Sequence, residues 1–230
     1  MNYTNIASIQ NMKFENGRFE PGTNYNPNDI RFNPKNTNIL GDVILSLQTG
    51  ASSIYSKFLM YFYYNWLPDY FFTTPASSTG KYHPAFANRE NGLVLHSLAV
   101  VEYAKQILEC IPCDNETYDR IIVAAFIHDA FKYGDPDKYT PNSFTVFEHP
   151  ILVSKFLQND YAVSIAQKLG LTMFDISFIS DIVASHMGPW NTNKHSNTVL
   201  PVPKSQFEMI LHKADYFASM KEGAIVSKYL

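Results

Sequence analysis

The chain has 230 residues, 46% of them hydrophobic, which is enough to bury a complete core as one domain or as one domain with an extension. Eighteen basic and twenty-one acidic residues give a net charge of -3. This near balance argues against a dedicated nucleic-acid coat protein and against a polybasic membrane binder, because both need clustered lysine and arginine. We therefore expect neither a stable nucleic-acid partner nor a membrane partner.

The beginning of the chain, MNYTNIASIQNMKFENG, lacks the cationic start and the apolar run of a secretory signal. The most apolar window, residues 54–72, is interrupted by polar residues and by Pro68, so it does not suit a bilayer span. Only two cysteines occur, Cys110 and Cys113, which argues against a disulfide framework. Together these features predict a cytoplasmic protein.

Residues 1–37 are rich in Asn, Pro, Gly and Thr, and they predict an irregular N-terminal arm that wraps the domain or serves homo-oligomerisation. From residue 38 to residue 230 the apolar spacing is helical, and no convincing alternation follows residue 93, so the predicted class is all-α. Helices are expected over residues 39–47, 52–67, 93–109, 115–129, 150–157, 162–169, 173–186 and 205–220. The second is dense in aromatic residues, which is more typical of helix packing than of nucleobase stacking.

A loop over residues 75–84, PASSTGKYHP, contains a Gly-Lys pair like that of a phosphate-binding P-loop. The comparison fails, because that motif needs Gly where Pro75 stands and Ser or Thr where Tyr82 stands. Lys81 and His83 remain candidates for binding an anionic substrate, although loop residues of these types are more often simply solvated.

The pair His128 and Asp129 ends the apolar run of residues 121–127, and so places an imidazole and a carboxylate where the protein interior is expected. Burying both groups is unfavourable unless something pairs them, and a single divalent metal ion can bind the imidazole and the carboxylate together. Four further candidate ligands, each on a different predicted helix or at its end, are His96, His149, His186 and Asp215. Because a helical bundle can bring such positions together in its core, the set predicts a metal site.

Nitrogen and carboxylate ligands without thiolate suit Mn, Fe, Co, Ni or Zn and, less well, Mg, bound as one ion or two. Two divalent ions would leave a site of four neutral histidines and two aspartates positively charged, and therefore attractive to phosphate. Lys132 follows His128 by four residues and Asp129 by three, so it shares their helix face and could reach that phosphate.

Taken singly, each of these residues also fits a structural role. A histidine near an apolar face is usually a hydrogen-bonded core residue, and His186 would complement the carboxyl end of its helix. His212 lies three residues before Asp215 on the same face, so it is an alternative ligand. The joint pattern, rather than any one residue, favours the metal site.

The order of these residues and their local strings, GLVLHS, AAFIHDAFK, EHP, SHMGPW and LHKADYFAS, resembles the HD-domain superfamily of metal-dependent phosphohydrolases over about residues 73–220. The resemblance implies an HD-domain helical bundle. It also implies a first metal held by four residues, a second metal held by three where the site is binuclear, and a lysine, Lys132, that assists the phosphate. The implied ligands are His96, His128, Asp129 and Asp215 for the first metal, and Asp129, His149 and His186 for the second.

Two positions depart from the pattern of that superfamily. Asn91-Gly92 stands where a Gly-Gly pair is common, and Phe131 stands where a small residue usually precedes the lysine. Residues 1–72 lie outside the shared motif, so the resemblance assigns them no role.

The leading expectation is a phosphohydrolase that cleaves a phosphoester bond of a small substrate, a nucleotide above all, through metal-activated water. In this interpretation Asp129 and Lys132 are catalytic, and Lys81, His83 and Lys132 bind the substrate. One alternative is a phosphodiesterase for cyclic (di)nucleotides or single-stranded RNA ends. Others are an HD-type oxygenase with two irons and a non-catalytic nucleotide-binding module.

Overall fold

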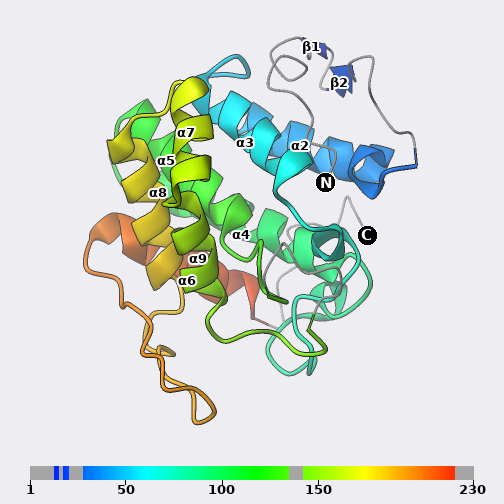
Figure 1. Cartoon of the computed structure of the whole chain (residues 1–230), viewed down its shortest axis with the longest axis vertical. Coiled ribbons are helices and arrows are strands. Elements are labelled where there is room, and N and C mark those ends of the chain that lie inside the picture. Colours follow the sequence, from blue (N-terminus) through cyan, green and yellow to red (C-terminus); the bar gives the residue numbers. More distant parts are fainter. Residues whose placement is uncertain (1–12, 16–17, 21–27, 135–141, 221–230) are drawn as a thin grey trace.

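The computed structural model describes residues 13–15, 18–20, 28–134 and 142–220, and Figure 1 shows helices packed around a shared interior. The predicted all-α class is confirmed, and every predicted helix is present, although the first begins at Pro34 rather than at Ile39. The α-helices are α2 (Pro34–Leu45), α3 (Ile54–Asn65), α4 (Gly92–Leu108), α5 (Asn115–Ile127), α6 (His149–Leu157), α7 (Asp160–Lys168), α8 (Met173–Ser185) and α9 (Gln206–Ala218). Short 3-10 helices are η1 (Ile30–Phe32), η2 (Asp69–Phe72) and η3 (Ala85–Ala87).

The predicted N-terminal arm is not irregular throughout. Strands β1 (Lys13–Glu15) and β2 (Arg18–Glu20) form a short antiparallel hairpin within it. Helix α2 also begins inside the predicted arm, because the Asn33 side chain accepts a hydrogen bond from the Lys35 amide at 2.9 Å and proline suits the first helical turn. Residues 1–12, 16–17 and 21–27 of the arm lie outside the described residues.

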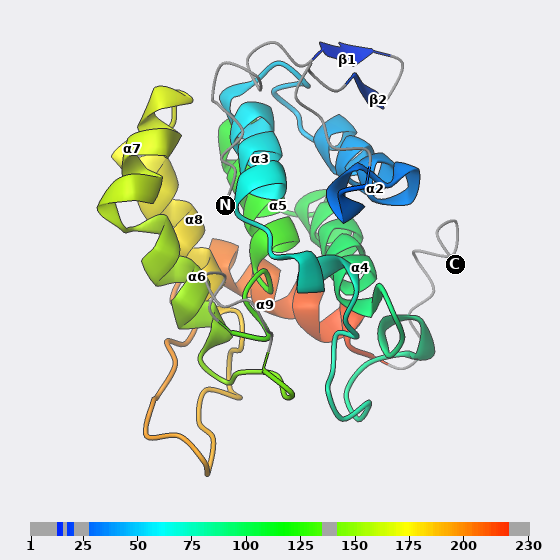
Figure 2. The same ribbon diagram turned by 45° about the vertical axis from the view of Figure 1, so that its right-hand side comes forward.

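Helix α5 lies at the centre of the bundle, in contact with α3, α4, α8 and α9 (Figure 2). Asp114 caps it by accepting a hydrogen bond from the Thr117 amide at 2.6 Å. Residues 121–127 are apolar on every side and fully buried, as expected of a helix enclosed by others. Because α5 runs through the core, the residues that follow it, His128 and Asp129, are also fully buried.

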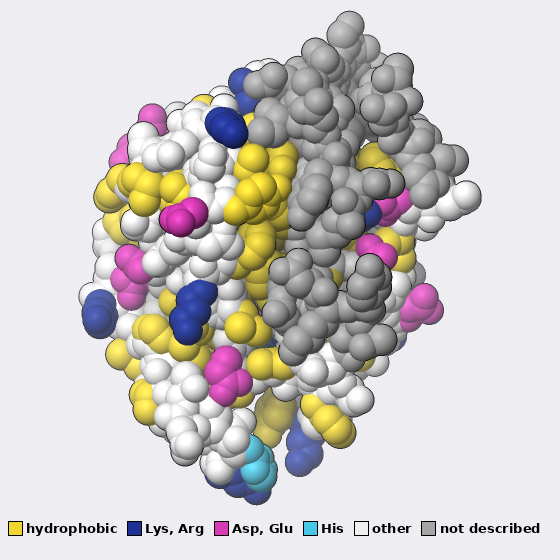
Figure 3. All heavy atoms as spheres, viewed as in Figure 1, with side chains coloured by type: hydrophobic (Ala, Val, Ile, Leu, Met, Phe, Trp, Pro, Cys, Tyr) yellow, Lys and Arg dark blue, Asp and Glu magenta, His cyan; other side chains and the backbone are white. Residues whose placement is uncertain are grey.

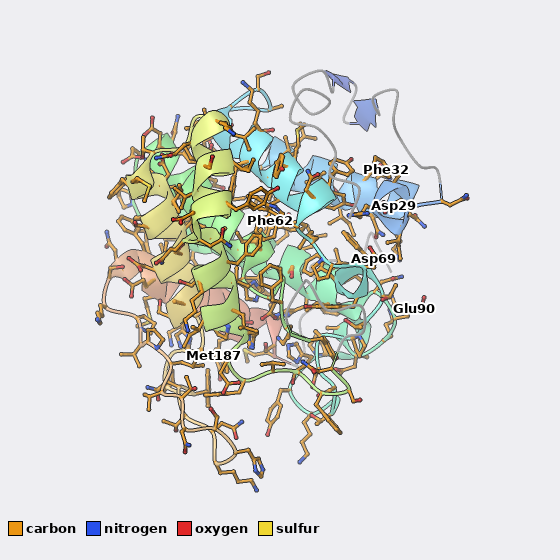
Figure 4. The ribbon with its side chains drawn as sticks, viewed as in Figure 1. Asp29, Phe32, Phe62, Asp69, Glu90 and Met187 are labelled. Atoms are coloured by element: carbon orange, nitrogen blue, oxygen red, sulfur yellow. The ribbon has the colours of Figure 1, made fainter. Side chains whose placement is uncertain are left out.

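The aromatic side chains of α3 form part of the core, as the sequence predicted. Phe62, which is labelled in Figure 4, is fully buried, and its ring centroid lies 5.5 Å from that of Trp66 and 6.4 Å from those of Phe131 and Phe156. Such contacts stabilise aromatic cores beyond simple burial. Phe131, one of the two departures from the HD pattern, therefore has a packing role.

A buried ion pair ties α5 to α8. Nε of Arg120 donates to Oδ1 of Asp175 at 2.6 Å, and the Tyr55 hydroxyl from α3 donates to the same oxygen at 2.9 Å. The other oxygen of Asp175 accepts from the Thr172 amide at 2.7 Å and so completes a capping box at the start of α8. This network fixes the positions of α3 and α8 relative to the central helix α5.

Loops over residues 73–91, 142–148 and 186–205 leave the same end of the bundle, at the bottom of Figures 1 and 2. Met187, labelled in Figure 4, lies at this end. On the face drawn in Figure 3, acidic and basic side chains of the described residues are scattered, with no large patch of either sign. Among the described helices, none has both the length and the apolar composition needed to cross a membrane.

Candidate metal centre

Five elements bring the six predicted ligands together. His128 and Asp129 follow the end of α5, while the other four lie on or at the ends of four more helices: His96 on α4, His149 at the start of α6, His186 directly after α8 and Asp215 on α9. All four histidines and Asp129 are at least 96% buried, and the side chain of Asp215 is 17% exposed. The polar groups therefore converge inside the bundle, with Asp215 nearest to solvent.

A first group of contacts surrounds Oδ2 of Asp129. This oxygen lies 3.3 Å from Nε2 of His128 and 3.5 Å from Nε2 of His96. Oδ1 of Asp215 closes the group, at 3.1 Å from Nε2 of His96 and 3.8 Å from Nε2 of His128. Two imidazoles and two carboxylates thus face one small space.

A second group surrounds the other oxygen of the same aspartate. Oδ1 of Asp129 lies 2.9 Å from Nε2 of His149 and 3.7 Å from Nε2 of His186, and these two nitrogens are 3.2 Å apart. Asp129 therefore presents one oxygen to each group. The sequence places Asp129 among the ligands but does not show how its two oxygens are divided, because that depends on the direction of its side chain.

The ligand atoms are better placed to bind a divalent cation than to form hydrogen bonds with one another. Nε2 of His96, Nε2 of His128 and Oδ1 of Asp129 are buried, and none has a hydrogen bond of acceptable geometry among the described residues. Unsatisfied buried polar atoms are unfavourable and rare. Three sets of ligand atoms lie within 4.8 Å of one another: His96, His128 and Asp129; His128, His186 and Asp215; and Asp129, His149 and His186. A bound metal would satisfy these atoms.

Backbone carbonyls orient three of the histidines toward the centre. Nδ1 of His128 lies 2.8 Å from the Ala125 carbonyl, Nδ1 of His149 lies 2.6 Å from that of Val146, and Nδ1 of His186 lies 2.7 Å from that of Val183. Each Nδ1 is therefore placed to donate its proton, which leaves a lone pair on Nε2 for a metal. His96 differs, because its Nδ1 has no hydrogen-bond partner among the described residues.

Burial and charge set the protonation of the carboxylates. Burial by itself raises the pKa of Asp129, but the neighbouring His128 and Lys132 charges outweigh it and hold the pKa well below the usual range. The pKa of Asp215 is also lowered, because its histidine neighbours outweigh its burial. Both carboxylates are therefore ionised at neutral pH, which is the form that a metal binds.

The histidines respond to burial in different ways. Burial, reinforced by the nearby His128 charge, lowers the pKa of His186 to about 3 and so keeps it neutral. Burial also acts to lower the pKa of His128, but the adjacent Asp129 charge outweighs it and raises that pKa. A metal on Nε2 would compete with this proton.

The predicted substrate-binding residues lie in different surroundings. Nζ of Lys132 contacts Oδ2 of Asp129 directly. The His83 ring lies 4.6 Å from the His96 ring, and its Nε2 is 3.5 Å from Oγ of Ser219. Burial lowers the pKa of His83 to about 2. Lys81 is exposed, and no contact joins it to the ligand cluster within the described part of the chain.

His212, the alternative ligand, does not join the cluster. Its Nδ1 lies 2.9 Å from the His186 carbonyl, and it is absent from the three ligand sets found among the described residues.

The other departure from the HD pattern, Asn91, has a backbone explanation. Asn91 adopts a left-handed conformation (φ 63°) that glycine accepts readily and asparagine tolerates. Ser219 beside His83 was not predicted, since no spacing in the sequence connects the two.

Comparison with curated proteins gave no match, and neither did comparison with solved structures. The sequence model of the HD domain family matches residues 93–220, which is more than half of the chain and includes all six predicted ligands. The helical bundle and the buried histidine-aspartate cluster agree with this match. The chain therefore belongs to the HD domain superfamily.

Proposed function

We propose that this protein is a metal-dependent phosphohydrolase that cleaves a phosphoester bond of a nucleotide. Membership of the HD superfamily supports a metal-dependent hydrolase, and the observation that carries the proposal is the division of Asp129 between two groups of buried imidazole nitrogens. A divalent metal in such a site activates water near neutral pH and neutralises phosphate charge. We propose His96, His128, Asp129, His149, His186 and Asp215 as its ligands.

Lys132 is the proposed partner of the phosphoryl oxygens. Its ammonium group contacts Asp129, and the Lys132 side chain as a whole is 12% exposed, so the residue borders the ligand cluster and keeps some contact with solvent. A cation in this position would stabilise the negative charge that develops on the phosphoryl group during attack by water. Asp129 would hold both the metal and the lysine, which gives these two residues the catalytic roles.

His83 and Lys81 are the proposed outer contacts of the substrate. His83 is nearly buried beside His96, and Nδ1 of His83 has no hydrogen-bond partner in the described part of the chain. A neutral imidazole could donate one hydrogen bond to a phosphate oxygen or to a sugar hydroxyl. Lys81 is two residues away on the exposed part of the same loop, where its charge would attract an anionic substrate.

Phosphate release by the purified protein tests this function. We expect turnover of nucleoside monophosphates or triphosphates with Mn²⁺ or Co²⁺, and loss of turnover with EDTA, in His128→Ala and in Asp129→Ala. Retained turnover in any of these three cases would contradict the proposal. Cyclic dinucleotides and labelled oligonucleotides in the same panel test the phosphodiesterase alternative, and O2 uptake with bound iron on an unphosphorylated substrate tests the oxygenase alternative.

A further inference from the structure

Two exposed aromatic rings stack on each other where the loop after α8 meets α9. Trp190, in the loop after α8, is 52% exposed, and Tyr216, on α9, is 40% exposed. Their centroids are 5.5 Å apart and their planes differ by 20°. Neither ring contributes to the buried core, although exposing two large aromatic side chains in contact with each other is unfavourable unless something covers them. We call this pair the aromatic platform.

The aromatic platform is connected to two of the predicted metal ligands, Asp215 and His186, through their immediate neighbours. Tyr216 directly follows Asp215 on α9, and one helical step turns a side chain by about 100°. On the other side, the Trp190 ring lies 5.7 Å from the His212 ring, whose Nδ1 is 2.9 Å from the His186 carbonyl. The buried His212 ring therefore lies between the Trp190 ring and the backbone of His186, and Tyr216 points to a different side of α9 from the adjacent Asp215.

A glycine holds the platform in place. Gly188 has φ +57°, and a Cβ at this position would lie 2.3 Å from Cε1 of His212. Only glycine allows the chain to pass this closely over the imidazole in a left-handed conformation. Pro189 then restricts the backbone directly before Trp190. Trp190 thus follows a conformationally restricted turn that packs against the buried His212 ring.

A planar aromatic group is the ligand that best matches these surfaces. Aromatic side chains stack on nucleobases whatever the sequence, because every base has a π-face. Nζ of Lys213 lies 5.9 Å from the centre of the Tyr216 ring, so a positive charge accompanies the platform. We propose that the aromatic platform binds the nucleobase of a nucleotide whose phosphate lies at the metal centre. This inference rests on the proposed function for the position of the phosphate.

Tryptophan fluorescence tests the platform in the intact protein. The chain has two tryptophans, and Trp66 is 5% exposed, so Trp190 is the emitter that a ligand can reach. We expect AMP to quench the emission and ribose 5-phosphate, which lacks the base, to leave it unchanged. By calorimetry, Trp190→Ala and Tyr216→Ala should each weaken AMP binding by roughly 5- to 150-fold, as expected when a base-stacking ring is removed. Ribose 5-phosphate binding should not change.

Phe174→Ala is the matched control, because Phe174 is 62% exposed at the opposite end of α8, and it should bind AMP like the wild type. Unchanged AMP affinity in both platform variants would overturn the inference, and so would an equal loss of AMP and ribose 5-phosphate binding. A dimer in sedimentation that Trp190→Ala converts to monomer with AMP affinity unchanged would also overturn it. If AMP binding depends on Trp190 while no phosphoester is hydrolysed, the platform is supported and the proposed function fails.

Discussion

Nε2 of His149 lies 2.9 Å from Oδ1 of Asp129, although His149 opens a different helix from the one that delivers Asp129. The opposite oxygen of the same carboxylate faces His96 and His128. One buried aspartate thus joins two sets of imidazoles. The two sets should respond differently to mutation, because each has histidines of its own and they share Asp129.

His149→Ala removes a nitrogen that belongs to only one set. We expect this variant to lose one metal ion per chain relative to the wild type and to keep the ion held near His96, because that set retains all of its ligands. Metal analysis after dialysis measures the change. His195→Ala, which removes an exposed loop histidine, is the control and should keep the wild-type content. Equal metal content in His149→Ala and wild type would show that His149 is not a ligand.

Lys132→Ala removes the cation beside Asp129 without removing a proposed metal ligand. We expect the rate of phosphate release to fall by about 10²- to 10³-fold, as when one preorganised donor to a developing oxyanion is removed. The metal content should stay at the wild-type value. Lys155→Ala, at an exposed position on α6, should leave the rate unchanged. Full activity in Lys132→Ala would remove Lys132 from the mechanism.

Gly188→Ala tests the turn that lies on His212. The new methyl group would meet the imidazole at 2.3 Å in a backbone conformation that L-residues rarely adopt, so we expect a loss of about 2–4 kcal/mol in the free energy of unfolding. Gly80→Ala is the matched control, since Gly80 has φ +65° and open space around it. The control should lose only the free energy of unfolding that comes from forcing a left-handed conformation on alanine, about 1–2 kcal/mol. Urea denaturation that gives equal losses would contradict the close approach.

Asp175→Asn tests the buried ion pair with Arg120. Removing the Asp175 charge leaves Arg120 with only the exposed Glu116 as an acidic partner, at 3.2 Å, and we expect a loss of about 3 kcal/mol in the free energy of unfolding at pH 7. Burial raises the pKa of Asp175, but hydrogen bonds from Thr172 and Arg120 outweigh it and the net pKa is lowered. Its contribution is therefore complete above the unfolded value near 3.8 and is lost as the pH falls through the lower folded value.

Urea denaturation of wild type and Asp175→Asn at pH 7, 4 and 3 measures this pH dependence. The difference between the two proteins should be largest at pH 7 and should shrink below pH 4, because the unfolded wild-type chain then takes up a proton at Asp175 that the folded protein does not bind. A difference that stays constant, or grows, as the pH falls would show that the charge of Asp175 does not provide the stabilisation.

The helices could be predicted from apolar periodicity and caps, and His128 and Asp129 stood out as polar groups at the end of an apolar run. The other four candidate ligands followed from their places on, or at the ends of, further predicted helices. Helix α2 was predicted to start too late, because the prediction began at the first periodic apolar residue and passed over the Asn33 cap. The division of Asp129 between two groups could not be predicted, since it depends on side-chain direction. Contacts such as Ser219 with His83 arise only from tertiary packing.

The convergence of buried histidines and aspartates on a metal is tested most directly by the metal content of Asp129→Ala. Asp181→Ala, at an exposed position on α8, serves as the matched control, and circular dichroism verifies that both variants are folded. We predict that wild type and Asp181→Ala bind Mn²⁺ in calorimetric titration after EDTA treatment, and that Asp129→Ala does not. Wild-type Mn²⁺ binding by a folded Asp129→Ala variant would contradict the account.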